Sequence, residues 1–131
     1  MGYYANSTGY LIIREEDVAA FKAVCDEHLY WGSDQMSLPE MIGLCVNEHV
    51  NGNMEVISPD LIEISWTGAG KQLSDDEEVY TNIAPLVQEG TIDWIEDLES
   101  DTRWRIRFEN KSWTNYEGIV TTAYPDDPYD N

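Results

Sequence analysis

The cysteines and histidines of this chain lie at spacings that could bind a metal ion. Cys25 and His28 are three residues apart, Cys45 and His49 are four apart, and these are all the cysteines and histidines in the sequence. Both spacings place the two side chains on one face of a helix, so two facing helices could hold a tetrahedral zinc ion. Alternatively, both cysteines are small core residues and the histidines border the same apolar faces.

Acidic residues are so abundant that no pair of them indicates catalysis. The chain has 26 acidic and 7 basic residues and a formal net charge of -19. A catalytic acid and base need environments that separate their pKa values, which a sequence does not reveal. The sequence also contains no nucleophile motif and no metalloprotease motif. We therefore expect a non-enzymatic protein, and the alternative is an enzyme or small-ligand binder without a recognisable motif.

The negative charge limits which partners are reasonable. Nucleic acids and anionic membranes are bound mainly through lysine and arginine, so we expect no direct nucleic-acid partner and no membrane partner. A protein with a basic, nucleic-acid-binding surface is a suitable partner, because charge of this size attracts basic surfaces. The alternative is that the acidity only keeps the protein soluble.

Three groups of carboxylates are candidates for the partner-binding surface, because each is expected at a helix start or near a hairpin. They are Glu15, Glu16 and Asp17; Asp75, Asp76, Glu77 and Glu78; and Glu96, Asp97, Glu99 and Asp101. A stripe of basic residues, Arg103, Arg105 and Arg107, alternates with apolar residues. We expect these arginines to pair with Asp93, Asp97 and Glu99 on a neighbouring strand.

Apolar periodicity and turn residues predict the elements that must position these side chains. Helices are expected where apolar residues recur every three or four positions, and strands where they alternate or form short runs. We predict helices at 15–29, 38–50 and 74–90, the second ended by Asn51-Gly52-Asn53 and the third kinked or shortened at Pro85. We predict strands at 9–14, 54–57, 61–66, 91–98, 103–109 and 113–124, a loop at 68–71, and a frayed tail at 125–131.

This order predicts one α+β domain with helices on one face of a mainly antiparallel sheet. A ferredoxin-like arrangement with an inserted helix is the more specific expectation. No apolar run is long enough to cross a membrane, and the N-terminus lacks the features of a signal peptide. We expect a cytoplasmic protein whose two cysteines are reduced and buried.

The two ends of the chain resemble small acidic proteins of phages and their bacterial hosts. The resemblance lies in the Met1-Gly2-Tyr3-Tyr4 start and in the C-terminal Trp104-x-Ile106-x-Phe108, with Trp113, Tyr116 and Glu117-Gly118-Ile119-Val120. It implies a mobile-element origin and a role like that of anti-CRISPR and other anti-defence inhibitors. The leading hypothesis is therefore an inhibitor whose surface carboxylates replace nucleic-acid phosphates on a host protein. The second is a small zinc-stabilised structural module.

Overall fold

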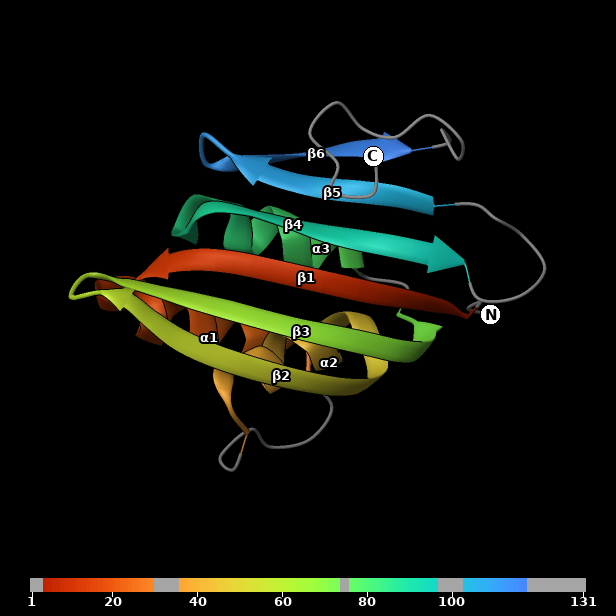
Figure 1. The fold of residues 1–131 in the computed structure, drawn as a ribbon, viewed down its shortest axis with the longest axis horizontal. Coiled ribbons are helices and arrows are strands. Elements are labelled where there is room, and N and C mark those ends of the chain that lie inside the picture. Colours follow the sequence, from red (N-terminus) through yellow and green to blue (C-terminus); the bar gives the residue numbers. More distant parts are fainter. Residues whose placement is uncertain (1–3, 30–35, 74–75, 97–102, 118–131) are drawn as a thin grey trace.

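The computed structural model describes residues 4–29, 36–73, 76–96 and 103–117. They form an antiparallel sheet of six strands with the order β2-β3-β1-β4-β5-β6 (Figure 1). The strands are β1 (Ala5–Arg14), β2 (Asn47–Ser58), β3 (Leu61–Gln72), β4 (Val87–Glu96), β5 (Arg103–Glu109) and β6 (Ser112–Glu117). The first strand in the sequence is thus central, and β2 and β6 form the two edges.

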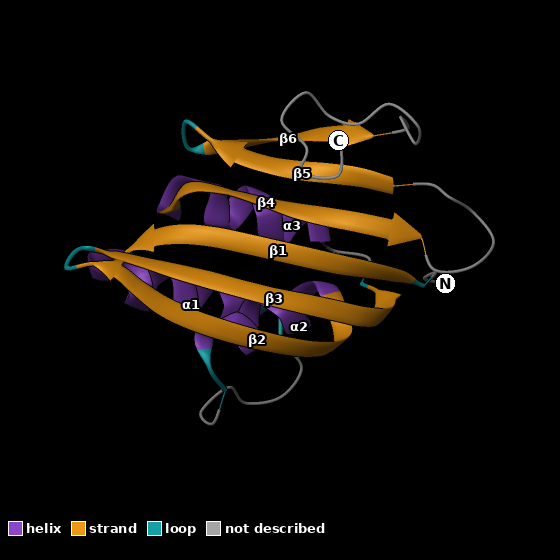
Figure 2. Ribbon diagram, in the orientation of Figure 1, coloured by secondary structure: helices purple, strands orange, loops and turns teal. Residues whose placement is uncertain are grey.

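All three α-helices lie against the same face of this sheet (Figure 2). They are α1 (Val18–Glu27), α2 (Leu38–Val46) and α3 (Asp76–Ile83), with short 3-10 helices η1 (Glu15–Asp17) and η2 (Ala84–Leu86). The predicted α+β class, with helices on one face, is confirmed. The ferredoxin-like detail is not confirmed, and the sheet continues past β4 with β5 and β6.

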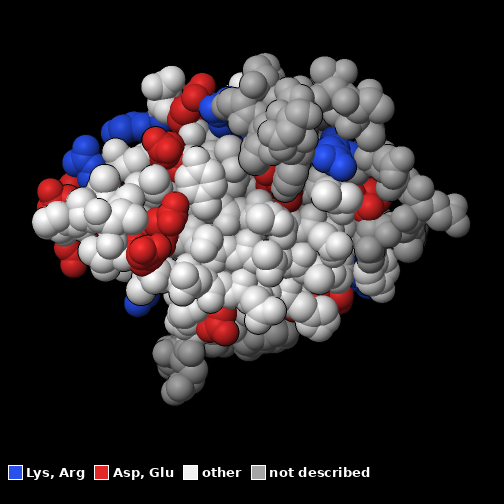
Figure 3. Space-filling view, in the orientation of Figure 1, with Lys and Arg blue, Asp and Glu red and all other residues white. Residues whose placement is uncertain are grey.

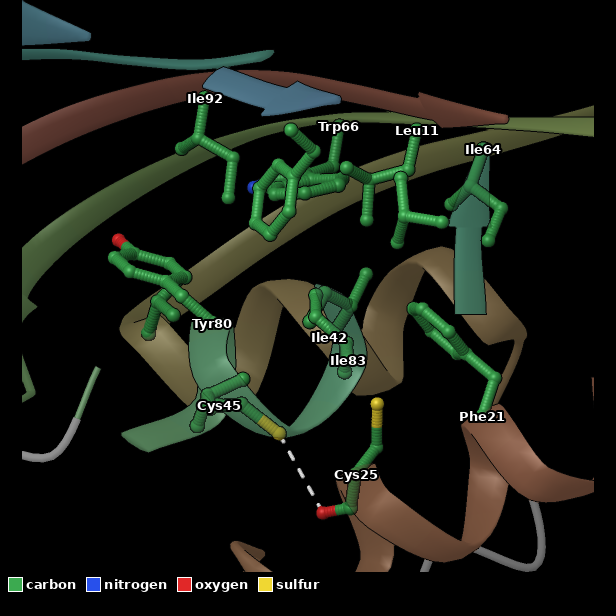
Figure 4. Close-up of a cluster of buried hydrophobic side chains, with 14 of the residues drawn as sticks. Leu11, Phe21, Cys25, Ile42, Cys45, Ile64, Trp66, Tyr80, Ile83 and Ile92 are labelled. Atoms are coloured by element: carbon green, nitrogen blue, oxygen red, sulfur yellow. Dashed lines mark hydrogen bonds between the residues drawn. The ribbon is translucent and has the colours of Figure 1, made fainter. Parts of the chain in front are cut away.

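The core lies between the sheet and the helices, and the central strand β1 shows the alternation that places side chains there. In β1 the odd-numbered residues are buried and the even-numbered ones are exposed or half-buried. Trp66 of β3 lies beside Gly9 of β1, where a Cβ atom would come within 2.5 Å of the indole ring. Leu11, Ile64 and Ile92 point from the sheet toward Phe21, Ile42 and Ile83 of the helices (Figure 4). Among the described residues, no helix lies over the opposite face of the sheet.

The start of α2 forms as its sequence predicts. The Ser37 hydroxyl accepts a hydrogen bond from the Glu40 backbone N–H at 3.3 Å, and the Glu40 carboxylate accepts one from the Ser37 N–H at 2.8 Å. This capping box satisfies two N–H groups that a helix start would otherwise leave unpaired. It fixes the point at which the chain enters α2.

Three predicted boundaries are wrong. Helix α2 ends at Val46, and residues 47–53, predicted as the helix end, belong to the long strand β2. Residues 68–71, predicted as a loop, continue β3. The third helix ends at Ile83, shortened before Pro85 as predicted, but β4 begins at Val87, where the helix was predicted to continue to Gly90. In each case pairing with a neighbouring strand decides the conformation, which local propensity cannot anticipate.

In the part of the chain that the structure describes, no helix is long and apolar enough to cross a membrane.

Candidate binding surface at the acidic end of the sheet

A row of carboxylates crosses the open face of the sheet near one of its ends. Glu55 of β2 lies directly opposite Glu63 of β3, Glu63 lies opposite Ile12 of β1, and Ile12 lies opposite Glu89 of β4. Glu55 and Glu89 are exposed and Glu63 is half-buried. Directly opposed residues have Cβ atoms about 5 Å apart, so Glu55 and Glu63 repel one another. This row is a concentrated negative surface.

The chain segments at the same end of the sheet add further carboxylates. Glu15 and Glu16 follow directly after β1, and Asp60 lies in the turn between β2 and β3. The Glu15 backbone N–H donates a hydrogen bond to the Asp60 carbonyl at 2.9 Å, which joins the two segments. We call Glu15, Glu16, Glu55, Asp60, Glu63 and Glu89 together the acidic end.

A groove of about 780 Å³ lies within the acidic end. Its lining includes Arg14, Glu15, Glu16, Asp60 and Gln88. Arg14 donates to Glu16 at 3.2 Å, but more than half of each side chain is exposed. A pair this exposed contributes about 0–1 kcal/mol and leaves most of the negative potential intact. The groove is therefore suited to a positively charged group from a partner.

Elsewhere on the described part of the open face, two arginines lie beside carboxylates. Arg105 binds Asp93 on the neighbouring strand through two hydrogen bonds of 2.6 and 3.1 Å. This confirms one of the predicted cross-strand pairs, while Arg107 lies 3.8 Å from Glu109 of its own strand. The middle of the face carries uncharged side chains such as Thr8, Ser65 and Thr67. Figure 3 accordingly shows a mostly uncharged centre, with acidic atoms densest toward the left, where β1 ends.

Tyr10 lies between the uncharged centre and the carboxylate row. Partial burial raises the pKa of its phenol, and the nearby Glu89 carboxylate raises it further. Glu63 acts in the same direction, whereas Arg107 and Arg105 oppose it. The phenol therefore stays protonated and offers a hydrogen-bond donor beside the acidic end.

Only part of the predicted carboxylate set contributes to this surface. Glu15 and Glu16 belong to the acidic end, and Asp17 is half-buried beside them. Glu77 and Glu78 are exposed on α3, on the helix side, and Glu96 lies at the far end of β4. Asp75, Asp97, Glu99 and Asp101 lie outside the described residues. The predicted groups therefore do not form one surface.

Asp76 has a structural position that contradicts its predicted role in partner binding. It is 8% exposed and accepts hydrogen bonds from the Tyr80 hydroxyl and the Gln72 amide, both at 2.9 Å. The Tyr80 oxygen in turn accepts from Trp94 Nε1 at 3.0 Å. Burial raises the pKa of Asp76 above its ordinary value. This carboxyl group stabilises the junction of α3 and the sheet.

Four members of the acidic end were not predicted: Glu55, Asp60, Glu63 and Glu89. For Glu63 a signal existed, because it lies between the apolar Ile62 and Ile64 and must point to the opposite face. Glu55 lies in the predicted strand 54–57, but its apolar neighbours Met54 and Val56 are themselves exposed, so alternation did not identify its face. Asp60 and Glu89 join the surface only through the strand order, which the sequence does not reveal.

The four predicted zinc ligands do not come together. Cys25 and Cys45 are adjacent in the core, where the Cys45 thiol donates to the Cys25 carbonyl at 3.4 Å (Figure 4). The neighbouring Cys45 side chain and burial raise the pKa of the Cys25 thiol, whereas zinc requires a thiolate. His49 lies on β2 and not on a helix. Among the described residues no three histidine, cysteine or acidic side chains are grouped so as to hold a metal ion.

Comparison with known proteins finds no matching family model, no matching curated protein and no matching solved structure. The functional assignment therefore depends on the chain's own residues.

Proposed function

We propose that this chain is a non-enzymatic, cytoplasmic binding protein that docks through its acidic end onto a basic surface of another protein. The observation that carries the proposal is the carboxylate row Glu55, Glu63 and Glu89, which lies at the same end of the sheet as the groove lined by Glu15, Glu16 and Asp60. Opposed like charges cost free energy in the isolated protein. A basic partner would reduce this repulsion, and the reduction in repulsion would favour binding.

The kind of basic surface follows from the shape and charge of the acidic end. Carboxylates on neighbouring strands are separated by the strand spacing of about 5 Å, so several basic side chains can be engaged at once. Surfaces with clustered lysine and arginine are typical of proteins that bind nucleic-acid phosphates. The favoured partner is thus a nucleic-acid-binding protein, and the chain acts as its inhibitor by occupying the phosphate sites. An inhibitor of a host defence complex, of the anti-CRISPR kind, fits this role.

The experiment is capture of partners from bacterial lysate at low salt, with three forms of the protein. The first is the wild type, and the second carries Glu55→Gln, Glu63→Gln and Glu89→Gln. The control carries Glu27→Gln, Glu77→Gln and Glu78→Gln, which remove the same charge from exposed positions on α1 and α3. The proposal predicts a discrete nucleic-acid-binding protein that is released by its own DNA or RNA. The first triple variant should lose it and the control should retain it.

Equal capture by both triple variants would show that net charge, and not the acidic end, determines binding. Capture of many basic proteins that nucleic acid does not displace would contradict the proposal. It would indicate that the acidic residues only keep the protein soluble.

A further inference from the structure

A second cavity, on the helix side of the sheet, contains both histidines of the chain. It has a volume of about 320 Å³ and lies between the end of α1, the second half of α2 and the first residues of β2. Its apolar walls are Leu29, Leu44 and Leu73. Small-molecule sites in proteins start at about 300 Å³, and a cavity of about 150 Å³ accepts benzene. The volume is thus sufficient for a fused two-ring molecule.

Besides the buried Asn47, the described lining of this cavity includes the polar side chains of His28, Glu48 and His49. His28 is half-buried at the end of α1, and Glu48 and His49 are exposed on β2. Imidazole rings are flat and can stack on another aromatic ring, and a carboxylate accepts hydrogen bonds from a cation. A few polar groups around an apolar cavity are the usual composition of a ligand site.

The backbone beside the cavity has an irregularity that positions Glu48 and His49. Asn47 pairs with Gln72 and His49 with Ala69, so β3 has one residue more than β2 over this interval. Gly70 adopts a positive φ of 91° in this bulge, and a Cβ atom there would lie 2.8 Å from the Glu48 carboxylate and 3.2 Å from the His49 ring. Bulges redirect side chains near functional sites. Glycine at position 70 is thus required for this arrangement.

The cavity is held open by hydrogen bonds that do not depend on a ligand. Asn47, at its edge, is fully buried, and its amide donates to the carbonyls of Ala5 at 3.0 Å and Lys71 at 3.2 Å. The Lys71 backbone N–H donates to Glu48 Oε1 at 3.1 Å. Only Oε1 is used in this bond, so Oε2 can accept a hydrogen bond from a ligand. The site is pre-formed.

We infer that this cavity binds a small aromatic amine. The ring lies among Leu29, Leu44 and Leu73 and against the imidazoles, and the ammonium group binds Glu48. The net charge of -19 also favours a cation over an anion of the same shape. This site is separate from the acidic end and makes use of the histidines that do not form a zinc site.

The test uses tryptamine as probe and indole-3-acetate as a probe of similar shape and opposite charge. Because the chain has two histidines, their ring signals in a proton–carbon NMR spectrum report directly on the cavity. Tryptamine should shift both histidine signals in a saturable manner, and indole-3-acetate should bind at least about tenfold more weakly. Absence of saturable shifts with both probes, or equal affinities, would overturn the inference.

Variants separate the site from non-specific attraction to an acidic protein. Glu48→Gln should weaken tryptamine binding about tenfold and leave binding of neutral indole unchanged. The matched control is Glu55→Gln, on the same strand but outside the cavity, which should leave tryptamine binding unchanged. If Glu55→Gln weakens binding as much as Glu48→Gln, the amine is attracted by the general negative field and the inference is wrong.

Discussion

Carboxylates lie on both sides of the sheet, and the buried Asp76 and the exposed row on the open face have different surroundings. On the helix side Asp76 is buried and accepts hydrogen bonds from Tyr80 and Gln72. On the open face Glu55 and Glu63 are opposed, and within the described residues neither of them forms an ion pair. The same chemical group therefore stabilises the fold in one place and opposes it in the other. Residues that oppose folding are the ones expected to serve binding.

The largest expected effect on stability comes from breaking the ion pair between Arg105 and Asp93 on the open face. Replacing Arg105 by Met would leave Asp93, whose side chain is 14% exposed, without its bidentate partner. We expect a loss of about 3 kcal/mol in the free energy of unfolding, because one charge of a buried pair is left uncompensated. Urea denaturation measures this loss. The double variant Arg105→Met, Asp93→Leu should recover most of it, and failure to recover would mean that Arg105 acts through packing.

On the helix side, Asp76→Ala should lower the free energy of unfolding by about 2 kcal/mol. The reason is that the Tyr80 hydroxyl and the Gln72 amide lose their acceptor. The matched control is Glu77→Ala, the next residue, whose exposed side chain should change stability by less than about 0.5 kcal/mol. Equal effects of the two variants in urea denaturation would contradict the contrast between the two sides.

The pH dependence of stability sharpens the description of Asp76. Burial raises its folded-state pKa above 3.8, so the native state holds this proton more tightly than the unfolded state. Its stabilising contribution is complete below pH 3.8 and is lost as the pH rises through the raised native pKa. The wild type should therefore lose stability relative to Asp76→Asn as the pH increases over this interval. A difference that is constant with pH would show that the folded-state pKa is not raised.

The smallest expected effect is an increase in the free energy of unfolding. Glu63→Gln removes the repulsion with Glu55 and should stabilise the fold by about 0.5 kcal/mol. Glu27→Gln, on the exposed face of α1, removes the same charge without an opposed partner and should have less effect. If both variants stabilise the fold equally, net charge determines the effect, and repulsion between Glu55 and Glu63 does not.

The sequence predicted the fold class because alternation and apolar periodicity are local signals. Alternation correctly predicted that the arginines of β5 lie on one face of the sheet and its apolar residues Trp104, Ile106 and Phe108 on the other. The turn at Asn110-Lys111, where both residues have positive φ, lies between the predicted strands 103–109 and 113–124. These features depend on neighbours in the chain.

The candidate site was harder to predict because it depends on distant pairing. Gly68 was predicted in a loop, yet it lies in β3 against Asn47 and Ser7, whose side chains would clash with a Cβ atom. Gly70, beside it, permits a bulge that only the pairing with β2 defines. The acidic end unites residues from five segments, which are η1, β2, the turn after β2, β3 and β4, and the strand order brings them together.

The most direct test of the acidic end is NMR mapping of a bound oligolysine peptide on the isotopically labelled protein. We predict that backbone amide shifts concentrate at Glu15, Glu16, Asp60 and the row Glu55, Glu63 and Glu89, and that they disappear in the triple Gln variant of the row. Shifts centred on Glu77 and Glu78, or spread evenly over all exposed carboxylates, would contradict the assignment of this surface as the docking site.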